Sequence, residues 1–194
     1  PRDHATEARS PAHTLLMLLS GKRCNSIDAF DIEYMQLRTD FCIFYPTRLL
    51  KHDRPGRPLK AITYRAFHED KLLCPVQAIA DYYVRRSELN STSSKLFLTT
   101  TPPHNGASKD TIGNWVKRLL ADSGVDTTIY KTHSCRAAST SKAYSFGLPL
   151  QTILAAGDWK SAETFHKHYL KEITDAFPAE EIPEVDFGIS ILSN

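Results

Sequence analysis

The spacing of apolar residues along the chain predicts a mainly helical protein. A run of leucines over residues 15–19 indicates a buried first helix that ends near Gly21. Pro75 suits the first position of a later helix and Ser108 the N-cap of another, because apolar residues follow each of them at helical spacing. In order, the pattern predicts helices near residues 15–20, 26–32, 75–84, 109–120, 134–146, 149–156 and 162–172.

Two short segments early in the chain have the composition of β-strands. Residues 34–38 and 41–45 predict a β-hairpin about the turn Thr39-Asp40, and residues 59–64 can return as a third antiparallel strand. A short strand or extended segment is expected at 95–99. The predicted fold class is therefore α+β and mainly α, with a small three-stranded antiparallel sheet.

The composition narrows the class of protein. The chain has 194 residues, of which 41% are hydrophobic and 24% charged, and these values are typical of one soluble globular domain. Its apolar runs are too short for a membrane span. The four cysteines are scattered without a CxxC pair, which favours reduced intracellular thiols over a disulfide framework or a zinc site. Because the sequence starts without Met, we expect a piece of a longer chain.

Charge is divided unevenly along the chain. The net charge is +2, but residues 172–194 hold six acidic residues and no Lys or Arg. The other 16 acidic and 24 basic residues give residues 1–171 a charge of +8. That charge favours a polyanionic partner such as nucleic acid, and an ordinary solubilising surface is the alternative. We divide the chain into a domain at 1–177 and an acidic arm at 178–194 that is either disordered or docked through its apolar residues.

One short motif could hold a phosphate. His133 and Arg136 lie three residues apart at the expected start of a helix, where both side chains would share one face. A guanidinium, an imidazole and free backbone N–H groups together suit a phosphate. Taken alone this motif is weak, and Tyr169 taken alone is a packed core tyrosine. His166 and His168 have no carboxylate or cysteine to complete a metal site, so we expect them to be surface imidazoles.

The order of several motifs is more specific than any one of them. They are Gly21-Lys-Arg23, the basic turn that begins at Lys51, His133-Ser-Cys-Arg136, Gly157-Asp-Trp159 and Tyr169. Together they resemble the catalytic domain of the tyrosine recombinase (phage integrase) family, from about residue 15 to about residue 173. Segments 51–59, 133–141 and 156–165 look most like the DIRS or Ngaro branch of eukaryotic retrotransposons, with the Crypton transposases next.

The resemblance implies covalent chemistry on DNA. Tyr169 would be the nucleophile, forming a 3′-phosphotyrosyl bond and releasing a 5′-hydroxyl. Arg23 and Arg136 would hold the phosphate oxygens and neutralise the charge that develops at phosphorus. The covalent bond would conserve the energy for religation, so the resemblance implies neither a metal nor a nucleotide cofactor.

The same resemblance assigns the proton transfers and the DNA contacts. Lys51 would protonate the leaving 5′-oxygen, His133 would assist proton transfer at the tyrosine, and the Trp159 indole would donate to a phosphate oxygen. Further DNA contacts are expected from five neighbouring basic residues, Lys22, Arg54, Arg57, Lys131 and Lys160. The expected partners are double-stranded DNA and further copies of the chain, as a dimer or tetramer, in the nucleus.

The chain also departs from the family pattern. Ser26 stands where many members have an acid, Lys60 rivals Lys51 as the hairpin lysine, and the interval from Trp159 to Tyr169 is one residue longer than in many bacterial members. The helical DNA-clamping domain that usually precedes the catalytic domain does not precede these motifs in the sequence. Two alternatives stay open, a domesticated DNA-binding domain without catalysis and a type IB topoisomerase.

Overall fold

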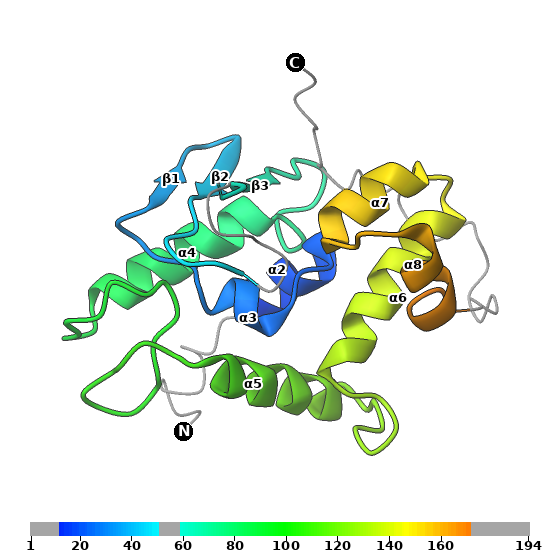
Figure 1. Ribbon diagram of the computed structural model, residues 1–194. Helices are drawn as coiled ribbons and strands as arrows, with labels where there is room; N and C mark the ends of the chain where they lie inside the picture. Colours follow the sequence, from blue (N-terminus) through cyan, green and yellow to red (C-terminus); the bar gives the residue numbers. More distant parts are fainter. Residues whose placement is uncertain (1–11, 51–58, 172–194) are drawn as a thin grey trace.

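Helix α2 (Ala12–Ser20) lies at the centre of the fold in the computed structural model, which describes residues 12–50 and 59–171 (Figure 1). Its apolar residues, including the fully buried Leu16, point to several sides of the helix, because the helix packs against four others. These are α3 (Cys24–Ile27), α4 (Pro75–Ser87), α5 (Lys109–Asp122) and α6 (Thr132–Ser145). The predicted first helix is confirmed, and it ends at Gly21, which has a positive φ of 57°.

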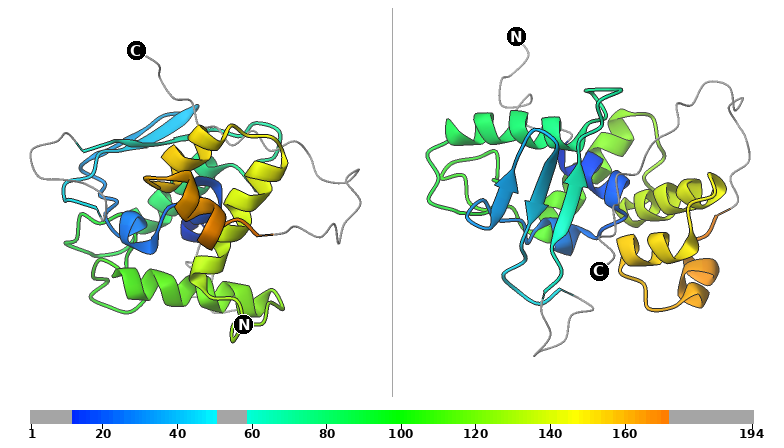
Figure 2. Two further views of the ribbon diagram at one scale, coloured as in Figure 1. Left: turned by 45° about the vertical axis from the view of Figure 1, so that its right-hand side comes forward. Right: turned by 90° about the horizontal axis from the view of Figure 1, so that it is seen from above.

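The predicted three-stranded sheet is also confirmed. Strands β1 (Met35–Leu37), β2 (Phe41–Phe44) and β3 (Ile62–Arg65) are antiparallel in the order β1-β2-β3. Alternate residues of β2 are buried, and the ring of Phe44 stacks on that of Phe30 with centroids 3.8 Å apart. Helix α4 packs against β3, and the view from above separates this side of the molecule from α6, α7 (Leu150–Gly157) and α8 (Ala162–His168) (Figure 2).

Two apolar clusters form the interior of the described residues. The larger one joins α2, the sheet, α4 and α5, whereas the smaller one consists of Ala143, Ile153, Leu154, Trp159 and Phe165. The smaller cluster holds α7 and α8 against the C-terminal half of α6. Helix α6 therefore connects both clusters, with Cys135 in the larger and Ala143 in the smaller.

Several element boundaries differ from the sequence prediction. The short helix expected at 26–32 spans Cys24–Ile27, because the Arg23 carbonyl already accepts from the backbone N–H groups of Ser26 and Ile27. Residues 95–99 make single bridges, Asp31 with Lys95 and Leu98 with Gly106, and are not part of the sheet. Ser108 caps α5 as expected, accepting from the Thr111 N–H at 3.1 Å.

The last helix is shorter than the predicted 162–172. It ends at His168, and Tyr169 is its C-cap residue. The backbone N–H groups of both Tyr169 and Leu170 donate to the Phe165 carbonyl at 2.8 Å, which closes the final turn. The basic turn at 51–58 and the arm at 178–194 lie outside the described residues. Among the described helices, none is both long and apolar enough to cross a membrane.

Candidate active site

The Arg136 guanidinium is buried where the ends of two helices meet. Arg136 as a whole is 1% exposed. One terminal nitrogen, Nη1, donates to the carbonyl of Gly21 at 2.6 Å, and the other, Nη2, donates to the carbonyl of Gly157. Gly21 follows α2 and Gly157 ends α7, so Arg136 ties both of these chain ends to α6. Such charge-assisted bonds offset part of the cost of burying the cation.

Two aromatic rings lie against the same guanidinium. Its central carbon, Cζ, is 4.0 Å from the ring centroid of Trp159 and 5.2 Å from that of Tyr169. The two ring centroids are 4.6 Å apart. A cation over an aromatic face is stabilised by the negative face of the ring, more strongly where water is excluded. Residues 136, 159 and 169, far apart in sequence, therefore form one cluster.

Two N–H donors in this cluster have nothing to bond. The Nε of Arg136 and the Nε1 of Trp159 are buried, and neither has a hydrogen-bond partner within the described part of the chain. An unmade bond at a buried donor costs about 1–3 kcal/mol, so such donors are rare in folded proteins. A pair of them beside one another indicates a position for an acceptor that comes from another molecule.

Arg23 adds a second cation to the cluster. It is the half-buried N-cap residue of α3, and its guanidinium has no hydrogen bond or ion pair with any other described residue. Burial and then repulsion from Arg23 lower the pKa of Arg136 to about 10, whereas Tyr169 and Asp158 oppose the shift. Arg136 therefore remains charged at neutral pH. The local electrostatics favour an anion between the two arginines.

A buried serine on α6 binds the backbone at Tyr169 and at Lys171. Ser141 is 1% exposed. Its hydroxyl donates to the Tyr169 carbonyl at 3.0 Å and accepts from the Lys171 N–H at 2.9 Å. These bonds carry the chain beyond the end of α8. Because Ser141 and Arg136 belong to one helix, α6 sets the distance between the guanidinium and the tyrosine ring.

Lys22 does not face solvent as a surface DNA contact would. Its side chain is 11% exposed, and its ammonium lies 2.8 Å from each carboxylate oxygen of Asp158. Burial lowers the pKa of Lys22, Asp158 opposes that shift, and Arg136 and Lys60 add to it. The structure therefore gives Lys22 an intramolecular partner that the sequence prediction lacked. Lys60, the rival hairpin lysine, lies close enough to act on it.

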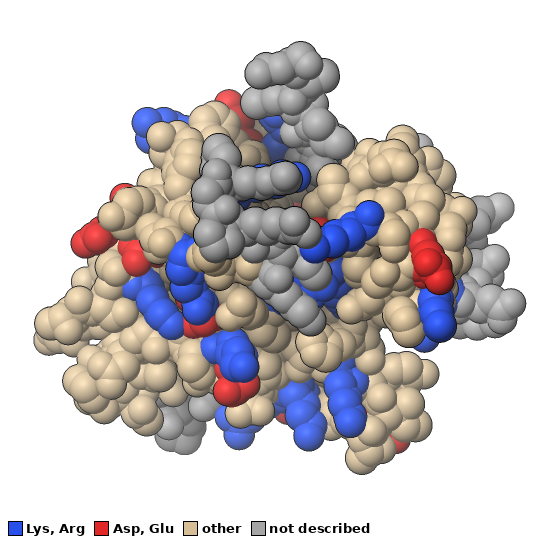
Figure 3. Space-filling view, in the orientation of Figure 1, with Lys and Arg blue, Asp and Glu red and all other residues tan. Residues whose placement is uncertain are grey.

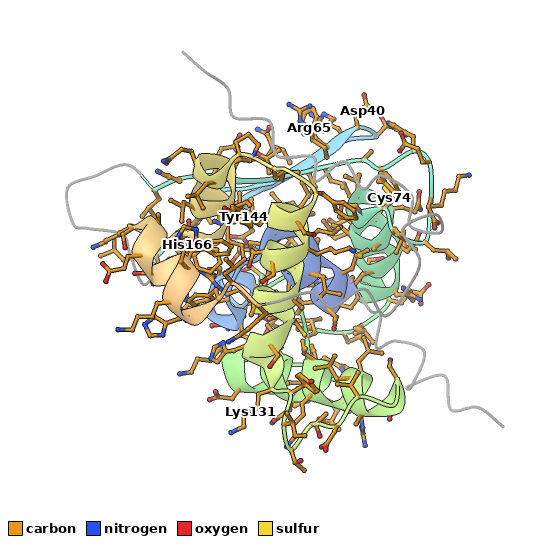
Figure 4. All side chains as sticks on the ribbon, turned by 90° about the vertical axis from the view of Figure 1, so that its right-hand side faces the viewer. Asp40, Arg65, Cys74, Lys131, Tyr144 and His166 are labelled. Atoms are coloured by element: carbon orange, nitrogen blue, oxygen red, sulfur yellow. The ribbon has the colours of Figure 1, made fainter. Side chains whose placement is uncertain are left out.

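The other expected site residues make no contact with this cluster among the interactions of the described residues. His133 is exposed at the start of α6, whereas Arg136, three residues on, is buried. The helix starts at Thr132, where the Lys131 N–H donates to Ser134 Oγ, and α6 turns Arg136 inward against α2 and α7. Lys131 and Lys160 are exposed, and Figure 4 shows Lys131 at the start of α6. Three expected residues, Lys51, Arg54 and Arg57, lie outside the described residues.

A basic surface lies along helix α5. Helix α5 buries Ile112 and Val116 and exposes Lys109, Lys117 and Arg118. Figure 3 shows Lys and Arg side chains gathered along α5 and toward the centre of the same face. The sequence prediction missed these three residues, although Lys117 and Arg118 lie off the apolar stripe of α5 and could have been found from it. A basic face of this kind suits the backbone of a nucleic acid.

Asp158 and Ser141 were missed for a different reason. No local signal marks either residue, because both act on partners distant in sequence, Lys22 and residues 169–171. His166, one of two histidines weighed as metal ligands, is exposed and packs its ring on Tyr144 at 6.0 Å, as Figure 4 illustrates. The described residues include no group of His, Cys, Asp and Glu side chains that could hold a metal ion.

The fold is similar to that of solved site-specific recombinases. No family model and no curated protein sequence matches the chain. The similar structures include the XerA recombinase, with a TM-score of 0.66 and 17% identity over 87% of this chain. They also include the XerH site-specific recombinase bound to its difH substrate before cleavage, with a TM-score of 0.63 and 16% identity over 86% of this chain.

The chain therefore has the fold of a tyrosine recombinase catalytic domain. XerH in its post-cleavage complex with palindromic difH matches equally well, with a TM-score of 0.63. The match covers 54% of XerA and 44% of XerH, so this chain spans about half the length of those recombinases. At this identity the comparison concerns the fold, and the chemistry has to be argued from the side chains.

Gly157 tests how tightly the cluster is packed. A methyl group on its Cα would meet the Trp159 ring, whereas on Gly113, inside α5, it would meet only Cys24 Sγ at 3.9 Å. We expect Gly157→Ala to destabilise the protein by about 2 kcal/mol through overpacking. Gly113→Ala should stabilise it by about 0.5–1 kcal/mol through helix propensity. Thermal unfolding with near-UV circular dichroism measures both, and equal stability of the two variants would contradict the tight contact at Trp159.

Proposed function

We propose that this protein cleaves and rejoins DNA through a covalent bond between Tyr169 and a strand phosphate. The observation that carries the proposal is the pair of buried, unpartnered donors, Arg136 Nε and Trp159 Nε1, next to the Tyr169 ring. A phosphodiester has oxygens that can accept from both donors and carries the charge that Arg23 and Arg136 favour. The fold shared with site-specific recombinases supports the same function.

The proposed step is an exchange of phosphate esters. The phenolic oxygen of Tyr169 attacks phosphorus, the new bond joins this oxygen to the 3′-phosphate, and the bond to the 5′-oxygen breaks. The arginines and the Trp159 indole bind the non-bridging oxygens, where negative charge grows in the transition state. In the reverse step a 5′-hydroxyl attacks the phosphotyrosyl bond. No energy source is required, because one ester replaces another.

Each direction needs a proton acceptor and a proton donor. We propose that His133 assists removal of the proton from the tyrosine hydroxyl. We assign protonation of the leaving 5′-oxygen to Lys51. His133 is exposed at the start of α6 and can approach a bound strand, while Lys51 falls between β2 and β3 in the sequence. Lys60 follows in the same interval and is the rival donor. Lys22 is less suited, because Asp158 binds its ammonium.

The biological setting is a separate proposal. The motifs at 51–59, 133–141 and 156–165 support recombination or integration of a eukaryotic mobile element, and hence action in the nucleus. Exchange of strands between two DNA sites requires several active sites, so we propose self-association on DNA as a dimer or tetramer. The acidic arm at 178–194 is the segment that we propose docks on a neighbouring copy.

Tyr169→Phe tests the nucleophile. We expect this variant to form no covalent adduct, because it lacks the attacking oxygen, while its DNA affinity and folding change little. The substrates are nicked duplexes of random sequence, in which the short fragment that carries the freed 5′-hydroxyl diffuses away after cleavage. An adduct that survives boiling in detergent is then mapped by mass spectrometry. Tyr144→Phe is the control, since Tyr144 is exposed beside α8, and it should form the adduct at the wild-type level.

The same assay separates the alternatives. A wild-type chain that binds the duplexes and yields no adduct would contradict the proposal in favour of a DNA-binding domain without catalysis. Relaxation of supercoiled DNA by the monomer, without joining of two DNA molecules, would instead indicate a type IB topoisomerase.

Arg136→Lys and Arg23→Lys test the phosphate contacts. Lysine keeps the charge but has no planar fork of donors, and at position 136 it cannot bond the carbonyls of Gly21 and Gly157 together. We expect the adduct to form at least about a hundredfold more slowly in either variant. Arg65→Lys on the exposed end of β3 is the control. Wild-type rates in both site variants would contradict the proposed contacts.

Lys51→Ala and Lys60→Ala test the proton donor. We expect Lys51→Ala to slow cleavage much more than Lys60→Ala, because a leaving alkoxide needs the proton and only the donor supplies it. A substrate with a 5′-bridging sulfur needs no proton at its leaving group, so it should restore the rate of the impaired variant. The opposite order of the two variants would assign the role to Lys60.

A further inference from the structure

One partly buried ion pair joins the two turns that carry the proposed phosphate contacts. Lys22 directly precedes Arg23, and Asp158 directly precedes Trp159. The Lys22 ammonium lies 2.8 Å from both oxygens of Asp158, across 136 positions of sequence. The side chains are 11% and 29% exposed, so solvent screens this pair less than it would a surface pair.

The backbone at Asp158 is shaped for this contact. Asp158 is the C-cap residue of α7 and has the left-handed conformation, with φ 54° and ψ 40°. Only Gly, Asn and Asp adopt this conformation at low cost, and of these only Asp carries a charge. The turn lets Gly157 present its carbonyl to Arg136 while the next side chain reaches Lys22. An uncommon backbone conformation at such a place favours a functional explanation over chance.

The charges around the pair explain why a carboxylate is needed. Lys22 lies near Arg136 and Lys60, and both of these cations repel its ammonium. The Asp158 carboxylate compensates this repulsion, and Lys22 keeps its place beside the arginine. Without it, Lys22 would turn toward solvent, and the Gly21-Lys22-Arg23 turn would lose one of its two links to the Gly157-Asp158-Trp159 turn. The other link is Arg136 itself.

We infer that Lys22 and Asp158 are positioning residues, whose ion pair sets where Arg23 and Trp159 stand around the scissile phosphate. The inference rests on the proposed function and deepens it. It replaces the expectation that Lys22 contacts DNA directly. The pair acts through its neighbours, so losing either partner has the same effect as losing both.

A double-mutant cycle separates the two roles. Asp158→Asn removes the charge and keeps a residue that tolerates the left-handed backbone, and Lys22→Gln removes the ammonium. Each single variant and the double variant should form the Tyr169 adduct about tenfold more slowly at saturating DNA, with DNA affinity changed little for Asp158→Asn. Lys22→Arg can still pair with Asp158 and should recover most of the rate. Asp81→Asn, an exposed acid on α4, is the control for the loss of one negative charge.

A second readout does not depend on DNA cleavage. The chain has two tryptophans, so Trp115→Phe leaves Trp159 as the reporter. In this background the Trp159 emission should move to longer wavelength by the same amount in Asp158→Asn, Lys22→Gln and the double variant, because the Gly157-Asp158-Trp159 turn loses its link to Lys22. Asp81→Asn should leave the emission unchanged.

The outcomes separate this inference from the proposed function. Independent effects on cleavage, with Lys22→Gln weakening DNA binding in the Asp158→Asn background, would restore Lys22 as a DNA contact and overturn the inference. Wild-type cleavage in Asp158→Asn, or an unchanged Trp159 emission in all variants, would overturn it as well. If no variant forms an adduct, wild type included, the proposed function fails, and the equal emission shifts still decide whether the pair positions the turn.

Discussion

The buried guanidinium of Arg136 is the constraint on which the site depends. A cation with 1% exposure is costly unless its donors are bonded, and two of them reach the carbonyls at the ends of α2 and α7. Arg23 follows Gly21 by two residues, and Trp159 follows Gly157 by two residues. Fixing the two glycine carbonyls therefore fixes the start of both turns that carry the proposed phosphate contacts.

The remaining side of the site is built from the same helix. Five residues after Arg136, Ser141 binds the backbone at Tyr169 and Lys171, and α6 thereby holds both the cation and the tyrosine. The Trp159 ring fills the space between them, 4.6 Å from the tyrosine ring. What this packing leaves unsatisfied are two N–H donors and the charge of Arg23. The proposed phosphate would accept from both donors and balance that charge.

The fold and the chemistry rest on different kinds of observation. Similarity to XerA and XerH at 17% and 16% identity establishes the arrangement of helices and sheet. An arrangement of that kind would survive the loss of any single catalytic side chain. The proposed reaction is argued from the side chains that the arrangement brings together, above all the two unpartnered donors beside Tyr169.

The sequence by itself determined the elements and the order of the motifs. Helical spacing of apolar residues located α2, α4 and α5, Ser108 marked a helix start, and alternation in 34–45 marked the hairpin, because these signals depend on neighbours in the chain. The motif order also identified Arg23, Arg136, Trp159 and Tyr169 as one set. Tertiary structure alone decided that α8 stops at His168, that Arg136 is buried, and that Lys22 is paired with Asp158. Each of these depends on a partner far away in sequence: Ser141 for the end of α8, the Gly21 and Gly157 carbonyls for Arg136, and Asp158 for Lys22. Local propensity contains no information about such partners, because the bonds exist only once the chain has folded.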